Sequence, residues 1–249
     1  MCDYDITVLS RAITLTAALA LLGPSLVVPR ATAPAFPRVV LWAWERPIDL
    51  RRLPAGTAVA FLAQTITIAD GAYLVSPRRQ PLRVDPSTPL VAVTRIDAPR
   101  GTGSPDVGAI ARAIAATSRL PRVTGVQIDF DARASQRALY RGILHRVRAG
   151  LPPDMPLAMT ALVSWCLDDD WLDELPVDEA IPMLFRMGPG ETALRAAWPS
   201  RTPASKCRGA IGVSLDEPAP FGPRGRRTYV FNPDPWTDTT ITAALEMKR

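Results

Sequence analysis

Short runs of β-branched and aliphatic residues recur along the chain, and their alternation with longer stretches limits the fold more than any other feature. A short apolar run is typical of a strand buried on both faces, as in a parallel sheet. We count eight such runs: Arg38 to Trp44, Ala58 to Ile68, Leu90 to Ile96, Thr124 to Asp129, Leu157 to Trp165, Ala180 to Phe185, Ala210 to Ser214 and Thr228 to Phe231.

The stretches between these runs carry apolar residues at helical spacing. The clearest extends from Arg133 to Ala149, with Leu139, Ile143 and Val147 at every fourth position. Eight strands that alternate with helices predict an α/β protein with a single (β/α)8 TIM barrel, and an open doubly wound sheet is the alternative. Further helices are expected at Pro105 to Leu120, Ile48 to Leu53, Asp168 to Glu174, Gly190 to Ala197 and Asp238 to Met247, with a loop at Ala69 to Ser87.

The amino-terminal segment is typical of an export signal. Residues 12–28 carry no charge, Arg11 and Arg30 flank them, and the small residues 31–33 suit a signal peptidase. We expect residues 1–33 to be a signal peptide or N-terminal anchor and residues 34–249 to form the barrel domain. The protein would then be exported, periplasmic or extracellular, and would touch a membrane only through residues 12–28 if the signal stays uncleaved.

Three cysteines occur in the chain, and cleavage of the signal would remove Cys2. In an oxidising compartment the remaining pair, Cys166 and Cys207, is a disulfide candidate. Two buried free thiols are the alternative.

The single histidine excludes several kinds of chemistry. His145 lies within the helical stretch described above, so neither a histidine-cluster metal site nor a Ser-His-Asp triad can form at a strand end. The net charge of +5 is modest and its arginines are scattered, which argues against a nucleic-acid partner. We expect a monomer that binds carbohydrate and needs no cofactor or metal.

Polar and apolar residues alternate in the fourth run, Val126-Gln127-Ile128-Asp129-Phe130-Asp131. If the apolar residues face the helices, the polar ones point into the barrel. A buried carboxylate is costly unless it is paired or active, so Asp129 and Asp131 are the candidate catalytic residues. The alternative for Asp131 is a capping role at the helix that follows.

The ends of the other runs place acids, two arginines and several tryptophans at the same rim. This set suits a neutral polyhydroxyl substrate, because indole faces pack on sugar rings and carboxylates bind hydroxyls. For Trp42 and Trp44 the alternative role is barrel packing. The candidate substrate-binding residues are Trp42, Trp44, Glu45, Arg95, Asp97, Gln127, Ser164, Trp165, Arg186, Asp216, Glu217, Asn232 and Trp236.

Five motifs in order along the chain resemble a bacterial domain-of-unknown-function family that is itself related to the TIM-barrel glycoside hydrolases. They are Val39 to Arg46, Gln127 to Asp131, Ser164 to Cys166, Pro182 to Gly188 and Asp216 to Pro218. The fourth run also resembles the Gly-x-Asp-x-Asp-x-Glu pattern of chitinase-like hydrolases, in which the Glu is the general acid. Gly125 and Asp129 match that pattern, whereas Gln127 stands at its first Asp and Asp131 at its Glu. The resemblance implies glycoside hydrolysis with Asp131 as the acid, and the two departures put the substrate-assisted mechanism in doubt.

The leading hypothesis is an exported barrel that hydrolyses a polysaccharide or cell-envelope glycan. In it Asp131 is the general acid, and Asp129 is its electrostatic partner or the nucleophile. One alternative is a non-catalytic glycan-binding or envelope-assembly protein on the same barrel. Another is a Mg- or Ca-dependent hydrolase that uses Asp129, Asp131 and Asp216 as oxygen ligands.

Overall fold

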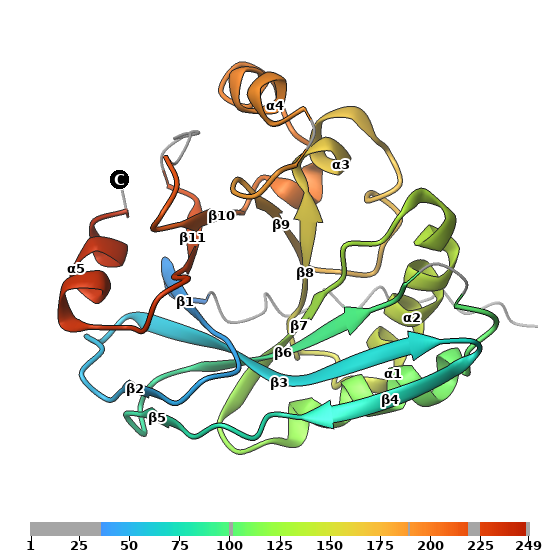
Figure 1. Ribbon diagram of the computed structural model, residues 1–249, viewed down its shortest axis with the longest axis horizontal. Helices are drawn as coiled ribbons and strands as arrows, with labels where there is room; N and C mark the ends of the chain where they lie inside the picture. Colours follow the sequence, from blue (N-terminus) through green and yellow to red (C-terminus); the bar gives the residue numbers. More distant parts are fainter. Residues whose placement is uncertain (1–35, 100–101, 189, 219–224, 248–249) are drawn as a thin grey trace, which may run out of the picture.

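A computed structural model describes residues 36–99, 102–188, 190–218 and 225–247 (Figure 1). The expected signal or anchor at residues 1–33 lies outside these ranges. Among the helices of the described ranges, none combines the length and the apolar character that a membrane span requires.

Eight parallel strands close into a barrel (Figure 1). Closure is set by the first strand, which pairs with the last strand on one side and with the next barrel strand on the other. All eight predicted runs form barrel strands, and the open doubly wound alternative is wrong because no edge remains between first and last strand. The strands are β1 (Val39–Ala43), β3 (Thr57–Ala69), β6 (Leu90–Asp97), β7 (Val123–Asp129), β8 (Leu157–Leu162), β9 (Glu179–Met183), β10 (Ala210–Ser214) and β11 (Arg227–Phe231).

Side chains alternate between the inside of the barrel and the layer beneath the helices. On β1, Val40 and Trp42 belong to the inner apolar cluster, whereas Val39 and Leu41 belong to the outer one. On β7 the apolar residues face outward, as predicted: Val126, Ile128 and Phe130 all lie in the outer cluster. This parity turns the polar residues of β7 toward the barrel axis.

Five α-helices are present among the described residues. Asp106 caps the first of them by accepting a hydrogen bond from the Ala109 amide at 2.9 Å. The predicted helices after the third, fourth, sixth and eighth barrel strands are confirmed within a few residues. The helices are α1 (Val107–Ala116), α2 (Arg137–Gly150), α3 (Val163–Asp168), α4 (Glu191–Ala197) and α5 (Asp238–Glu246), with 3-10 turns η1 (Thr117–Arg119), η2 (Ala134–Gln136) and η3 (Ser205–Cys207).

The first connection of the barrel contains a strand, so the helix predicted at Ile48 to Leu53 is wrong. Ile48–Leu50 forms β2, which pairs with β5 (Leu82–Val84) outside the barrel. Buried Ile48 and Leu50 flank exposed Asp49, which is the two-residue period of a strand. Pro54 closes the segment before a helix could complete two turns.

The second connection also lacks a helix, and its predicted loop at Ala69 to Ser87 is wrong. Instead β4 (Ala72–Pro77) folds back on β3 as an antiparallel hairpin (Figure 1). Asp70 and Gly71 form its two-residue turn with φ of 50° and 80°. Positive φ at both positions is typical of a type I′ turn, for which Asp-Gly is a preferred pair.

The helix after the fifth barrel strand begins earlier than predicted. β8 ends at Leu162 and α3 begins at Val163, whereas the sequence predicted a strand to Trp165 and a helix from Asp168 to Glu174. Asp168, Asp169 and Asp170 stand in a row, and such a cluster of acids disfavours a helix interior. Cys166 on α3 forms the predicted disulfide with Cys207 on η3, with the Cα atoms 6.0 Å apart.

The amino end of the barrel is closed by Phe36. Its ring lies under the Arg227 guanidinium at 5.4 Å, and Arg227 also forms an ion pair of 2.6 Å with Glu179. A Cβ placed on Gly125 would overlap the Phe36 ring, so glycine at this position of β7 makes room for the aromatic plug. The plug leaves the carboxyl end of the barrel as its open end.

Gly125→Ala is expected to lower the free energy of unfolding by about 1–3 kcal/mol, because the methyl group forces the Phe36 ring out of place. This loss of stability should largely disappear in a Phe36→Ala background. Urea unfolding of the unmodified protein, the two single variants and the double variant measures it. Gly142→Ala is the control, since its Cβ would lie 3.6 Å from Val107, an ordinary contact. An equal Gly125→Ala penalty in both backgrounds would contradict the plug.

Candidate functional site

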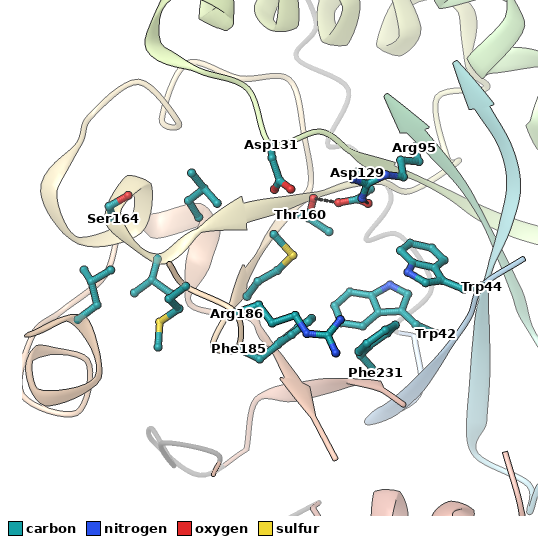
Figure 2. A pocket seen from close by; sticks show the side chains of 15 residues that line it. Trp42, Trp44, Arg95, Asp129, Asp131, Thr160, Ser164, Phe185, Arg186 and Phe231 are labelled. Carbon is teal, nitrogen blue, oxygen red and sulfur yellow. Dashed lines mark hydrogen bonds and ion pairs between the residues drawn. The ribbon is translucent and has the colours of Figure 1, made fainter. Parts of the chain in front are cut away.

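A pocket of about 490 Å³ opens at the carboxyl end of the barrel strands (Figure 2). Its walls come from the ends of β1, β6, β7, β8, β9 and β11 and from the segments that follow them. This is the end at which barrels of parallel strands carry their sites. The lining residues are Trp42, Trp44, Arg95, Asp129, Asp131, Thr160, Leu162, Val163, Ser164, Met183, Phe185, Arg186, Met187, Leu194 and Phe231.

Asp129 is the buried acid of the pocket, with 3% of its surface exposed. Its Oδ2 accepts a hydrogen bond of 2.8 Å from Arg95 Nη1, and its Oδ1 accepts one of 2.8 Å from Thr160 Oγ1. Arg95 lies directly across from Asp129 in the β6–β7 register, so the ion pair follows from strand pairing. Both carboxylate oxygens therefore have fixed partners, and the guanidinium offsets the cost of burying the charge.

Asp131 is the free acid of the pocket. It follows β7 by two residues, lies exposed at the mouth, and accepts no hydrogen bond within the described part of the chain. Partial burial by the pocket walls, together with the nearby charge of Asp129, raises the pKa of the Asp131 carboxyl above its ordinary value, while Arg95 opposes the shift. The structure shows no helix cap here, because the turn η2 begins at Ala134 without a side-chain cap from Asp131.

Aromatic rings form the wall opposite the two acids (Figure 2). Phe185 and Phe231 stack face to face, with ring centroids 5.5 Å apart and planes 7° apart. The ring centroids of Trp42 and Phe185 are 6.1 Å apart, and those of Trp44 and Phe231, which meet edge to face, are 6.4 Å apart. The pocket therefore joins carboxylates on one side to flat apolar surfaces on the other, which is a combination suited to a sugar ring.

Gln127 lies below the pocket rather than in its wall. Its side chain is fully buried inside the barrel, where Oε1 accepts a hydrogen bond of 3.3 Å from Trp42 Nε1. This contact orients the indole, so Gln127 is a positioning residue for Trp42. The other half of its amide, Nε2, has no partner in the described structure.

Seven of the sequence-predicted site residues meet in the pocket: Trp42, Trp44, Arg95, Asp129, Asp131, Ser164 and Arg186. Two more support them from behind. Asp97 accepts a hydrogen bond of 3.0 Å from Arg95 Nε, and Glu217 accepts one of 3.1 Å from the Arg186 amide.

The structure does not bring the remaining candidates to the pocket. Glu45 accepts hydrogen bonds from the amides of Arg79 and Gln80, and so holds the connection beyond β4. Trp165 is packed edge-on against Trp171 in the outer layer, because α3 has already begun at that position. Glu45 and Trp165 were expected at the rim from their positions at the ends of predicted strands, but these contacts direct their side chains elsewhere.

Three candidates lie at the carboxyl end of the barrel but outside the pocket lining. Asp216 accepts hydrogen bonds from Ser214 and Arg186, and the Ser214 hydroxyl is the main cause of its lowered pKa. Asn232 shapes the turn after β11 by binding the Pro235 carbonyl, at 3.2 Å. Trp236 donates from Nε1 to the Trp42 carbonyl at 3.1 Å, so it supports β1 from outside.

Sequence reasoning missed most of the apolar lining. Phe185 and Phe231 close their predicted strands, and the last residue of a strand followed by a loop was the signal that could have placed them at the rim. The apolar lining residues that the sequence did not single out are Leu162, Val163, Met183, Phe185, Met187, Leu194 and Phe231.

A metal centre is not assembled by the acids of this region. Within the described residues, no three His, Cys, Asp or Glu side chains are grouped as metal ligands require. The set of Asp129, Asp131 and Asp216 predicted for Mg or Ca is therefore wrong, since Asp129 is already bound to Arg95 and Asp216 lies with Ser214.

No protein-family model, curated protein or solved structure matches the chain. The family resemblance stays a prediction, and the structure itself establishes an α/β protein built on a closed barrel of eight parallel strands.

Proposed function

We propose that this chain is a glycoside hydrolase that acts on a polysaccharide or cell-envelope glycan. The observation that carries the proposal is Asp131: a carboxyl without a hydrogen-bond donor among the described residues, at the mouth of an aromatic-lined pocket, with a raised pKa. A carboxyl that retains its proton to higher pH than an ordinary aspartate is suited to protonate a leaving oxygen.

Asp129 acts in this proposal as a fixed negative charge. Because Arg95 and Thr160 occupy its two oxygens, electrostatic stabilisation of the transition state is favoured over attack on the sugar. The transition state of glycoside hydrolysis carries positive charge on the ring oxygen and anomeric carbon. A buried carboxylate beside that ring stabilises the charge as it develops.

The proposed reaction balances on these groups and one water. The bond between the anomeric carbon and the leaving oxygen breaks, its electron pair goes to that oxygen, and Asp131 supplies the proton. Water then adds to the anomeric carbon, and its surplus proton returns to the Asp131 carboxylate. Trp42 and Trp44 hold the ring during both steps by packing against its apolar faces.

Export of the protein belongs to the same proposal. The disulfide between Cys166 and Cys207 supports it, because such bonds persist in oxidising compartments. A secreted or periplasmic hydrolase would meet polymeric glycans directly.

The test is release of reducing sugar from a panel of bacterial exopolysaccharides, cell-wall glycans and chromogenic glycosides. We expect turnover whose rate falls as pH rises through the raised pKa of Asp131, because the acid must be protonated. Saturable binding without product would instead identify a glycan-binding barrel. Neither binding nor product across the panel would overturn the proposal.

A further inference from the structure

Arg186 occupies an unusual place in the pocket. It follows β9 with a φ of 49°, in the left-handed region that residues other than glycine rarely adopt. Its amide donates to Glu217, and Glu217 in turn forms an ion pair of 2.7 Å with Arg195. These contacts thus hold the Arg186 backbone in an unfavourable conformation, and residues with strained backbones cluster at ligand sites.

The Arg186 guanidinium lies over an aromatic platform formed by Phe231 and Phe185. Its Cζ is 5.0 Å from the Phe231 ring centre, and the rings of Phe185 and Phe231 are stacked. Figure 2 shows the side chain extending across the pocket toward Trp42 and Phe231. A guanidinium placed over a ring keeps its N–H groups in its own plane, where they can bind a planar anion from the side.

Most donors of this guanidinium have no acceptor among the residues that the structure describes. Within the described residues its one acceptor is Asp216, at 3.4 Å, and both side chains of that pair are about half exposed. Arg95, the other arginine in the pocket lining, already forms ion pairs with Asp129 and Asp97. Arg186 is therefore the cation available to a ligand.

We infer that Arg186 selects a sugar that carries a carboxylate, a uronic acid, through a bidentate ion pair on the Phe231 platform. This inference rests on the proposed function and replaces the neutral substrate expected from the sequence. Arginine and carboxylate match in plane and spacing, which makes their charge-assisted hydrogen bonds strong and directional.

Matched acid and ester ligands test the inference. Oligosaccharides of polygalacturonate, alginate and hyaluronate are compared with their methyl esters, which keep the ring and lose the charge. Affinity is measured by calorimetry or tryptophan fluorescence in an Asp131→Asn background, so that no ligand is consumed. At least one acid is expected to bind about 10- to 100-fold tighter than its ester, the value of a charge-assisted contact.

Two variants and one control locate this selectivity. Arg186→Met should bring the ratio of acid to ester affinity close to one, and Arg186→Lys should give an intermediate ratio because it keeps charge without the planar fork. Arg52→Met is the control: Arg52 is exposed, has a similar 3.4 Å ion pair with Asp238, and lies outside the pocket. It removes the same net charge and should leave the ratio as in the parent.

The outcomes separate this inference from the proposed function. Equal affinity for acid and ester, or a ratio unaffected by Arg186→Met, overturns the inference and leaves a glycan pocket in place. If the Asp131→Asn variant binds acids selectively but the unmodified protein turns none of them over, the result supports the inference and overturns the proposed hydrolase function. Absence of binding by every acid and ester overturns both.

Discussion

Asp131→Asn is expected to lower kcat about 10²- to 10⁴-fold on whichever glycoside the protein hydrolyses fastest, with little change in affinity. The amide matches the carboxyl in size but has no proton to transfer at any working pH. Since Asp131 has no hydrogen-bond partner in the described structure, the substitution breaks no contact that holds the fold. Initial rates and ligand affinity measured on the same preparations check the result.

The matched control for this substitution is Asp234→Asn. Asp234 is exposed in the turn after β11, at the same end of the barrel, and is not part of the pocket lining. It should retain the rate of the unmodified protein. Equal rates for Asp131→Asn and the unmodified protein would assign the proton transfer to another group.

The pH profile adds a second check on Asp131. Its raised pKa keeps the acid protonated to higher pH than an ordinary aspartate would, so the alkaline limb of kcat/KM should lie above the usual aspartate range. In Asp131→Asn the residual rate should lose this limb. A limb that persists in the variant would belong to another titrating group.

The barrel strands were predictable because closure buries each of them on both faces. Such strands appear in the sequence as continuous apolar runs, and β1, β3 and β6 are clear examples. Parity along β7 then placed Asp129 on the inner face, which needed only the two-residue period of a strand. The catalytic candidates therefore follow from local pattern alone.

The connections were less predictable, for two different reasons. β2 and β5 have three residues each, too few to establish a period, and they become strands only by pairing with each other. The β3–β4 hairpin did carry a local signal, the Asp70-Gly71 pair, whose positive φ values the turn requires. That signal outweighs the lack of a periodic element, which suggested a loop.

The end of a strand is harder to predict than its parity. Ser164 and Trp165 were placed at the rim because the predicted run ended at Trp165, but β8 stops at Leu162 and the helical turn that follows turns Trp165 outward. Phe185 and Phe231 come together with Trp42 only because the barrel closes between β1 and β11. Contacts made by closure connect distant parts of the sequence, and no local pattern contains them.

Arg95→Met is expected to lower the free energy of unfolding by about 2–4 kcal/mol at neutral pH, because it leaves Asp129 buried without its cation. Arg95 is 40% exposed on its side chain, which places the effect below that of a fully buried pair. Urea unfolding at about pH 7 measures the change in the free energy of unfolding. Arg51→Met is the control, since its pair with Asp49 is exposed to solvent and should contribute little to the free energy of unfolding.

Adding Asp129→Asn to Arg95→Met should recover most of the lost stability, because the amide is neutral and can still accept the hydrogen bond from Thr160. A deficit that is not relieved by Asp129→Asn would mean that Arg95 acts through packing. If the recovery is seen, Arg95 offsets the cost of burying the Asp129 carboxylate inside the barrel, two residues before Asp131. The ion pair then links the stability of β6 and β7 to the charge on which the proposed chemistry depends.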